Sequence, residues 1–243
     1  PIQKSDGAWT YFAPDIAYHW SKIDRGFDAL IDIFGADHGG YIKRMQAAVK
    51  AVTAGKATLD VKIVQLVKLL RDGEPVKMSK RSGNFVTLAD VVREVGRDVV
   101  RFTMLTRKPD AQMDFDFAKV VEASKDNPVF YVQYAHARIC SILAQAAERG
   151  GQSAGAEGRG AHIDRLTAPT EYALMARMAA FPAMLTEAAR ELAPHQLAYY
   201  LKDLAADFHA FYNAERVLVD DAELQSARMA LLEAVRTVLR RGM

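Results

Sequence analysis

The pattern of hydrophobic residues changes once along this 243-residue chain, and that change limits the folds open to it. Residues 1 to about 108 alternate between strand-like and helix-like segments, whereas residues from about 116 onward have helical periodicity only. Alternating strands and helices predict an α/β layer with a parallel sheet, and successive amphipathic helices predict a bundle. We therefore predict an α/β part over residues 1–115 and an all-α bundle over residues 116–243.

Local signals place the elements of the first part. An apolar run predicts a strand over residues 29–34, and apolar residues at helical spacing predict a helix over residues 41–52. Residues 59–69 alternate strongly, first at Leu59, Val61 and Ile63 and then from Val64, which predicts strand structure. The Asp-Gly and Pro within residues 71–75 predict a turn. Thr87, with an acidic residue three positions later, predicts the capped start of a helix.

The second part begins with a clear helix start. Asn127 followed by Pro128 predicts it, because Asn caps helices well and Pro suits the first helical position. This helix should run to about Ala147. The segment 148–162 holds five glycines among small polar residues and predicts a flexible connection. Further helices are expected over residues 168–191, 194–213 and 220–241.

Composition excludes several classes of protein. Half of the residues are hydrophobic and 26% are charged, which favours a packed core over disorder. The single cysteine, Cys140, excludes an intrachain disulfide framework and a Cys-rich zinc site, and it fits a reducing compartment. No apolar run approaches the roughly 20 residues that span a membrane. Residues 56–108 carry twelve Lys and Arg against six Asp and Glu; this excess suits a polyanion, and an ordinary solvated face explains it equally well.

The run from Val76 to Asn84 carries the sharpest chemical signal. Lys77 and Lys80 flank Met78 and Ser79, and another cation, a Gly and an Asn follow. Two ammonium groups and backbone N–H donors can neutralise the charge that develops on a leaving pyrophosphate in chemistry at ATP. A basic surface turn has the same charge pattern, so the literal string decides between the two interpretations.

That string resembles the KMSK signature loop of class I aminoacyl-tRNA synthetases, and three more stretches resemble the arginyl-tRNA synthetase family. Asp6–His19 resembles the family's arginine-pocket segment, and Phe34–Ile42 resembles its "GADH" stretch near the nucleotide. Asn127–Arg138 resembles the entry into its helical anticodon-binding domain. The resemblance covers nearly the whole chain and is weakest from about residue 149 to 162. It implies part of a Rossmann-like catalytic domain followed by an anticodon-binding bundle of the DALR type.

The resemblance also implies roles in the catalytic part. By this resemblance, Lys77 and Lys80 are catalytic residues that contact the ATP phosphates and stabilise the transition state of amino-acid activation, and Met78 and Ser79 shape their loop. The other implied contacts are Asp37 and His38 with ATP, and Tyr11 and Asp15 with arginine. A carboxylate suits a planar guanidinium, and a tyrosine ring can stack on it. The alternative to ligand binding is a helix cap for Asp15 and for Asp37, and a core position for Tyr11. The nearby His19 is expected to be a core histidine.

In the helical part, the resemblance implies tRNA contacts from one stretch of polar and aromatic residues: Tyr131, Gln133, Tyr134, His136 and Arg138. Aromatic rings stack on unpaired bases, and cations hold phosphates. Bundle core is the alternative for the aromatic residues here, and the same choice applies to Phe208, Phe211, Tyr212 and Asn213.

The implied activity is ATP-dependent ligation of L-arginine to an arginine-accepting tRNA through arginyl-adenylate, with ATP as its Mg²⁺ complex. The resemblance further implies a cytoplasmic enzyme that is a monomer at full length. We expect no metal site of the protein's own, since Asp37 and His38 do not make a closed coordination shell. The sequence does not indicate which tRNA bases are read.

One family signature is missing, because no H-x-G-H occurs in the chain. Together with a start at Pro1 in sequence that resembles mid-domain, this predicts a carboxy-terminal fragment that is inactive alone. Two other interpretations stay open: a cysteinyl-tRNA synthetase-like enzyme, against which Asp15 argues, and a non-catalytic tRNA-binding protein of synthetase ancestry.

Overall fold

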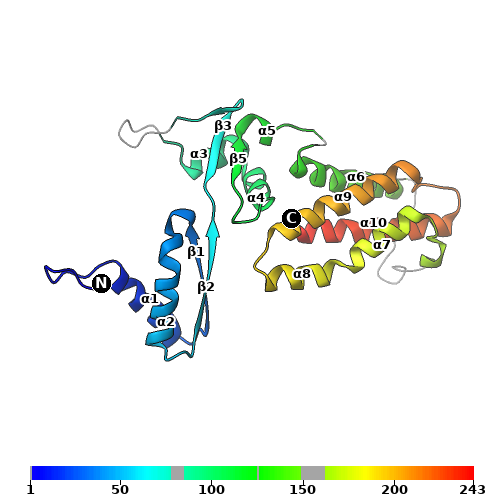
Figure 1. Cartoon of the computed structure of the whole chain (residues 1–243). Helices are drawn as coiled ribbons and strands as arrows, with labels where there is room; N and C mark the ends of the chain where they lie inside the picture. The colour runs from blue at the N-terminus through cyan, green and yellow to red at the C-terminus, as the bar shows by residue number, and fades with distance from the viewer. Residues whose placement is uncertain (1, 78–84, 125, 149–161) are drawn as a thin grey trace. The chain divides into compact units, whose positions relative to one another are not determined.

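The computed structural model describes residues 2–77, 85–124, 126–148 and 162–243 (Figure 1). The chain forms two compact units. Unit 1 comprises Pro1–Leu69 and Lys108–Phe115, and unit 2 comprises Leu70–Arg107 and Asp116–Met243. Along the chain, the elements are mixed α/β at first and helical afterwards, as predicted. The domain boundary between residues 115 and 116 stays a prediction.

The elements follow the chain in this order: α1 (Phe12–Asp24), β1 (Ala29–Gly35), the 3-10 helix η1 (Ala36–Tyr41), α2 (Ile42–Val52), β2 (Thr58–Val64), β3 (Val67–Arg71), β4 (Glu74–Pro75), α3 (Leu88–Val95), α4 (Arg97–Leu105), β5 (Met113–Asp116), α5 (Phe117–Val120), α6 (Pro128–Glu148), the 3-10 helix η2 (Ile163–Arg165), α7 (Pro169–Ala179), α8 (Phe181–Arg190), α9 (His195–Ala214) and α10 (Ala222–Gly242). Strands β4, β3 and β5 form one sheet in that order.

Unit 1 is built on a parallel strand pair. Strand β1 pairs with β2 from Ala29–Thr58 to Gly35–Val64. Parallel strands need a crossover connection, and η1 with α2 supplies it, so that α2 lies along the pair (Figure 1). The buried core of this unit joins strands and helix through four side chains: Leu30, Met45, Val49 and Leu59. The predicted strand over residues 29–34 and helix over residues 41–52 are confirmed.

The strand-like run expected over residues 59–69 forms two strands, β2 and β3, with a break at Gln65 and Leu66. Two apolar residues follow each other at Ile63 and Val64, which interrupts the alternation of faces. At the break, the Gln65 N–H donates to the Pro109 carbonyl at 2.8 Å instead of to a strand partner.

The turn predicted within residues 71–75 is confirmed as the tight connection from β3 to β4. Asp72 and Gly73 have φ values of 52° and 84°, the signs that a type I′ turn needs and that Asp-Gly tolerates. The capped helix start is also confirmed: Thr87 Oγ1 accepts from the Asp90 N–H, and Asp90 Oδ2 accepts from the Thr87 N–H.

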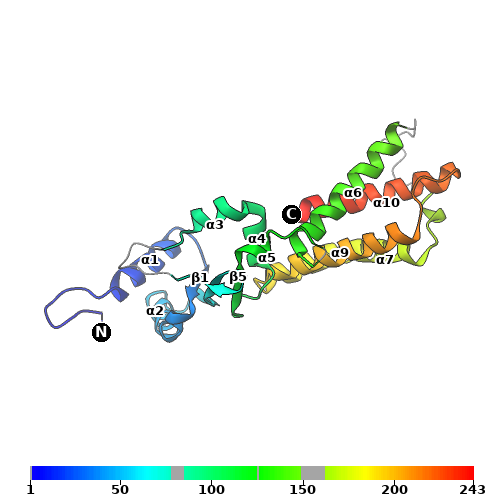
Figure 2. The same cartoon turned by 90° about the horizontal axis from the view of Figure 1, so that it is seen from above.

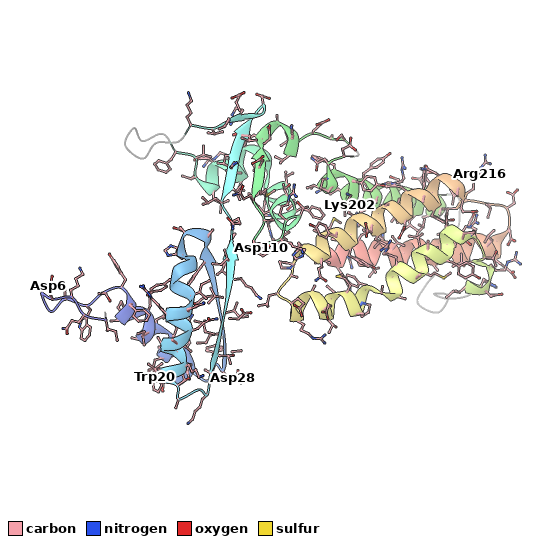
Figure 3. The ribbon with its side chains drawn as sticks, viewed as in Figure 1. Asp6, Trp20, Asp28, Asp110, Lys202 and Arg216 are labelled. Atoms are coloured by element: carbon pink, nitrogen blue, oxygen red, sulfur yellow. The ribbon has the colours of Figure 1, made fainter. Side chains whose placement is uncertain are left out.

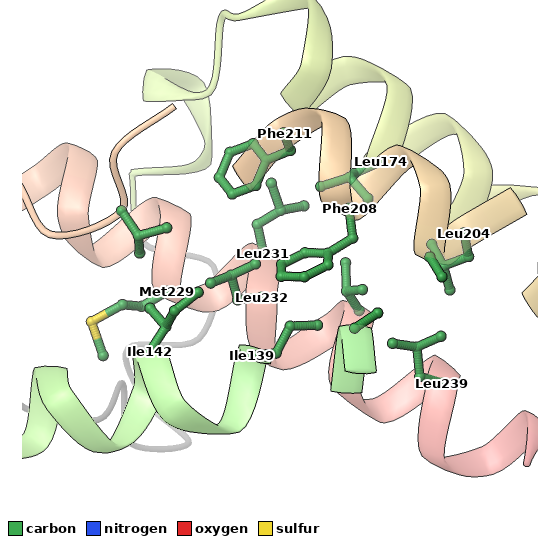
Figure 4. Close-up of a cluster of buried hydrophobic side chains, with 14 of the residues drawn as sticks. Ile139, Ile142, Leu174, Leu204, Phe208, Phe211, Met229, Leu231, Leu232 and Leu239 are labelled. Atoms are coloured by element: carbon green, nitrogen blue, oxygen red, sulfur yellow. The ribbon is translucent and has the colours of Figure 1, made fainter. Parts of the chain in front are cut away.

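Unit 2 centres on α9, which packs against α6, α7 and α10 (Figures 1 and 2). The large apolar side chains of these helices point into one core, shown in Figure 4: Ile139, Leu174, Leu204, Phe208, Phe211, Leu231, Leu232 and Leu239. Helix α6 begins as predicted, because Asn127 Oδ1 accepts from the Val129 N–H at 3.1 Å.

The single helix expected over residues 168–191 is wrong. Helix α7 ends at Ala179 and α8 begins at Phe181, with Pro182 in its first turn. Proline lacks the N–H that a continuing helix needs and clashes with the preceding turn. Most of the predicted flexible connection at 148–162 lies outside the described residues. No helix in the described ranges is both long and apolar enough to cross a membrane.

Candidate functional site

The first candidate site is a cavity in unit 1 where β1 passes into η1. Its lining includes polar and aromatic side chains from α1, β1, η1 and α2: Asp15, His19, Asp32, Phe34, His38 and Tyr41. Ligands of open α/β sheets bind beyond the carboxyl ends of the strands, and this cavity has that position. Asp15 and His38 were predicted as site residues.

Asp15 lies in the first turn of α1, and its carboxylate accepts a hydrogen bond from an uncharged group. The Tyr41 hydroxyl donates to its Oδ2 at 2.8 Å. Burial and the bond to Asp15 raise the pKa of Tyr41 to about 12, so the phenol is protonated at neutral pH. Within the part of the chain that the structure describes, the Asp15 carboxylate forms no ion pair. It therefore presents an uncompensated negative charge to the cavity.

Asp32, the second carboxylate of the cavity, has basic side chains as partners instead. Its Oδ2 lies 2.8 Å from His19 Nε2, and its Oδ1 lies 3.6 Å from Lys22 Nζ. The other ring nitrogen of His19 donates to the Asp15 carbonyl at 2.7 Å. His19 is thus a buried histidine with both nitrogens bonded, as expected, and Asp32 holds it in place.

The other predicted residues of unit 1 lie outside this carboxylate pair. The Tyr11 side chain is 91% exposed and does not line the cavity, so the structure does not bring it together with Asp15. Asp37 and His38 are largely exposed on η1, 3.5 Å apart, and Asp37 does not cap α2. Sequence reasoning missed Tyr41, although it lies inside the quoted stretch around "GADH".

The predicted phosphate-binding loop has well-anchored ends. Lys77 is exposed after β4, whereas Met78, Ser79 and Lys80 lie outside the described residues. Before the loop, the Gly73 N–H donates to Asp116 Oδ2 at 2.7 Å. Burial would raise the pKa of Asp116, but this bond and other backbone N–H donors outweigh burial and lower it. After the loop, the capping box at Thr87 fixes the start of α3.

The second candidate site is a depression on the helical unit. Tyr131, Tyr134 and Arg138 of α6 line it with His209 and Asn213 of α9. These residues include three of the predicted tRNA contacts. In the described ranges, no three His, Cys, Asp or Glu side chains form a group that could hold a metal ion.

Arg138 makes this depression both cationic and aromatic. Its guanidinium carbon lies 4.4 Å from the Tyr134 ring centre and 4.2 Å from that of Tyr212, and its Nη2 donates to the Tyr134 hydroxyl. The His209 ring stacks on Tyr134 at 5.6 Å and lies 4.7 Å from Tyr131. Sequence reasoning missed His209, since a single histidine on an apolar helix is typical of a core.

His136 is separated from the other predicted tRNA contacts. It lines a different cavity with Arg101 and Leu197, and Gln133 lines both cavities. Its Nδ1 lies 3.8 Å from Cys140 Sγ. Burial, with nearby arginines, lowers the pKa of His136, so it is uncharged at neutral pH. The structure thus unites Tyr131, Tyr134 and Arg138 and leaves His136 apart.

Family comparisons agree with this architecture. Residues 21–116 match the family described as tRNA synthetases class I (I, L, M and V), and residues 132–243 match the DALR anticodon binding domain. The chain is therefore part of a class I aminoacyl-tRNA synthetase, with a piece of the catalytic domain followed by a helical anticodon-binding domain.

Individual relatives narrow the family. The arginine–tRNA ligase of Cereibacter sphaeroides (strain ATCC 17029) is 56% identical over 249 residues, which cover 100% of this chain and 43% of that protein. That of Bradyrhizobium sp. (strain ORS 278) is 57% identical over 256 residues, with the same coverage of both chains. The chain belongs to the arginyl-tRNA synthetase family, and it spans about 43% of the length of these curated relatives.

Solved structures share the fold. The putative arginyl-tRNA synthetase of Campylobacter jejuni superposes with a TM-score of 0.84 at 35% identity, covering 99% of this chain and 51% of that one. The Thermus thermophilus arginyl-tRNA synthetase superposes with a TM-score of 0.76 at 23% identity, covering 99% of this chain and 48% of that one. The second likeness concerns the fold alone.

Proposed function

We propose that this chain supplies the KMSK loop, the arginine pocket and the tRNA-binding bundle of an arginine–tRNA ligase. The observation that carries the proposal is the 56% identity to arginine–tRNA ligases over the whole chain. The proposed catalytic part is residues 1–115, and the proposed anticodon-binding domain is residues 116–243. Monomeric state and cytoplasmic location stay predictions from the family.

The proposed reaction has two steps. The arginine carboxylate attacks the α-phosphorus of ATP, so that the arginyl-adenylate bond forms and pyrophosphate leaves. The 2′- or 3′-hydroxyl of the terminal adenosine of the tRNA then attacks the arginyl carbonyl, and AMP leaves. Lys77 and Lys80 act in the first step by stabilising charge on the phosphates. Mg²⁺ enters with ATP and reduces the charge of the phosphates.

The cavity of unit 1 supports arginine as the amino acid. Asp15 offers a carboxylate without an ion-pair partner among the described residues, which suits a guanidinium and not a cysteine thiol. Asp37 and His38 are proposed to line the neighbouring ATP site, and Tyr11 to approach the arginine from outside the cavity.

The depression on the helical unit supports RNA as the partner. Tyr131, Tyr134 and Arg138 combine ring faces with a cation, the combination that holds unpaired bases and phosphates. Gln133 lies at its edge. His136 is proposed to act at a separate place, since it lines another cavity.

The catalytic proposal is testable in a chimera in which this chain replaces the matching segment of the Cereibacter sphaeroides ligase. Arginine-dependent ATP–pyrophosphate exchange, with tRNA present, should appear in the chimera and be absent from the isolated chain, which has no H-x-G-H. Lys77→Ala should slow exchange by a factor of about 100 to 1,000, typical of losing one charge-stabilising group. Lys56→Ala, an exposed lysine before β2, is the control.

Robust exchange by the isolated chain would contradict the need for the H-x-G-H half. Binding of an arginine-accepting and a cysteine-accepting tRNA at two salt concentrations tests the bundle. Selective binding that persists at higher salt supports the arginine assignment. Equal binding that salt abolishes indicates a basic surface only.

A further inference from the structure

The two carboxylates of the unit 1 cavity differ in the charge of their partners. Asp32 is paired with His19 and Lys22, both of which can carry positive charge. Asp15 is hydrogen bonded by the phenol of Tyr41, which is neutral. A cationic partner would offset the attraction of a carboxylate for a cationic ligand, whereas a neutral donor leaves it in place. Asp15 is therefore the carboxylate available to a guanidinium.

We propose that Tyr41 is a positioning residue for arginine: its hydroxyl holds the Asp15 carboxylate in a fixed orientation without neutralising it. This inference rests on the proposed function, and it assigns a positioning role to a tyrosine other than the predicted Tyr11. The bond joins positions 26 apart in the sequence, so no local spacing indicates it.

The Tyr41 ring is packed against two other aromatic rings, as suits a positioning residue. It makes an edge contact with Phe12 at 5.6 Å and a tilted contact with Phe34 at 6.3 Å. Tyr41 ends η1 and directly precedes α2, so its backbone is fixed by the crossover that packs on the strands. Phe12, Tyr41 and the core of unit 1 form one cluster, which places the hydroxyl at the cavity wall.

The bond leaves Asp15 able to bind a planar cation. Each carboxylate oxygen has two acceptor positions, and Tyr41 uses one position on Oδ2. The remaining positions on both oxygens suit the parallel N–H groups of a guanidinium. With the carboxylate plane fixed in advance, less side-chain freedom is lost when arginine binds.

The test measures binding of L-arginine and of L-citrulline, its neutral analogue, by titration calorimetry of the 243-residue chain. The KM for arginine in the chimera provides a second readout. The variants are Tyr41→Phe, Asp15→Asn and both together. Tyr18→Phe is the matched control, since Tyr18 lines the same cavity and its hydroxyl has no hydrogen bond in the described part of the chain.

Tyr41→Phe should weaken arginine binding about tenfold, as for losing a hydrogen bond to a charged group. KM for arginine should rise by the same factor while KM for ATP stays unchanged. In the Asp15→Asn background, Tyr41→Phe should have no further effect, and citrulline should bind weakly to every variant. Tyr18→Phe should stay within about twofold, because no charged-group bond is lost.

Normal arginine affinity and KM in Tyr41→Phe, with a large loss in Asp15→Asn, would overturn the role of Tyr41 and leave the arginine pocket standing. An equal effect of Tyr41→Phe in both backgrounds would also overturn it, since the hydroxyl would then act independently of Asp15. If neither the chain nor the chimera uses arginine, the proposed function itself fails, which is a separate result.

Discussion

Replacing Glu171 with alanine should destabilise the helical unit by about 4 kcal/mol, the sum of a buried ion pair and a helix cap. Glu171 is 1% exposed in the first turn of α7. Its Oε2 accepts from the Ala168 N–H at 2.8 Å, and its Oε1 accepts from Arg228 Nε at 2.6 Å. The side chain thus stabilises a helix start and a buried cation together.

The magnitude follows from what Arg228 keeps. This arginine is 7% exposed and also donates to Glu215 Oε2 and to the Arg216 carbonyl, each at 2.6 Å. Breaking a buried pair costs about 3–5 kcal/mol, and Glu215 still compensates the charge, which favours the lower end. Losing the bond to the Ala168 N–H adds about 1 kcal/mol.

Urea unfolding of the 243-residue chain, followed by far-ultraviolet circular dichroism, measures this change. Glu187→Ala is the matched control, because Glu187 pairs with Arg190 at 2.8 Å on an exposed helix face and should cost less than about 1 kcal/mol. Glu171→Gln keeps the acceptor and loses the charge, so it should fall between the two.

A loss below about 1 kcal/mol in Glu171→Ala would refute the reasoning, because Arg228 would then not depend on its buried partner.

The same substitution should affect the proposed RNA site. Arg228 also donates to the carbonyl of Arg216, which is labelled in Figure 3 and follows the end of α9. Near that end of α9, Tyr212 and Asn213 border the proposed RNA site. Glu171→Ala should therefore also weaken tRNA binding, and Glu187→Ala should not.

Three further outcomes are expected. Hydrogen bonds from Thr87 lower the pKa of Asp90 from 3.8 to about 2. This carboxylate therefore contributes stability above about pH 4, and that contribution is lost as pH falls toward 2. Thr87→Ala should move the pKa of Asp90, measured by carbon NMR, back toward 3.8. Burial, with nearby Arg138, lowers the pKa of His209, so proton NMR should show this histidine titrating below the ordinary value of 6.5. The free energy of unfolding should decrease as pH falls from about 6.5 to the lowered pKa, because the unfolded chain takes up the proton first. Tyr134→Ala should weaken tRNA binding by about 1–3 kcal/mol, the value of one stacked base, whereas Tyr172→Ala, an exposed tyrosine on α7, should not.

Short-range chemistry explains what could be predicted from the sequence alone. The box at Thr87 and the cap at Asn127 each involve atoms at most three residues apart, so the residue types identify them directly. The turn at Asp72-Gly73 is equally local, because its backbone signs suit those two residues. The family signature around Lys77 is likewise contained in a few consecutive positions.

Contacts between distant positions were decided by the tertiary structure. The break in residues 59–69 follows an interrupted alternation at Ile63 and Val64, but the bond from the Gln65 N–H to the distant Pro109 carbonyl is visible only in the tertiary structure. The partner of Asp15 turned out to be Tyr41, because the β1–η1–α2 crossover brings α1 and η1 together. His209 joins the face of Tyr134 only because α9 packs on α6. Residue types determined which chemical groups this chain carries, and packing of segments far apart in the sequence determined which of those side chains meet.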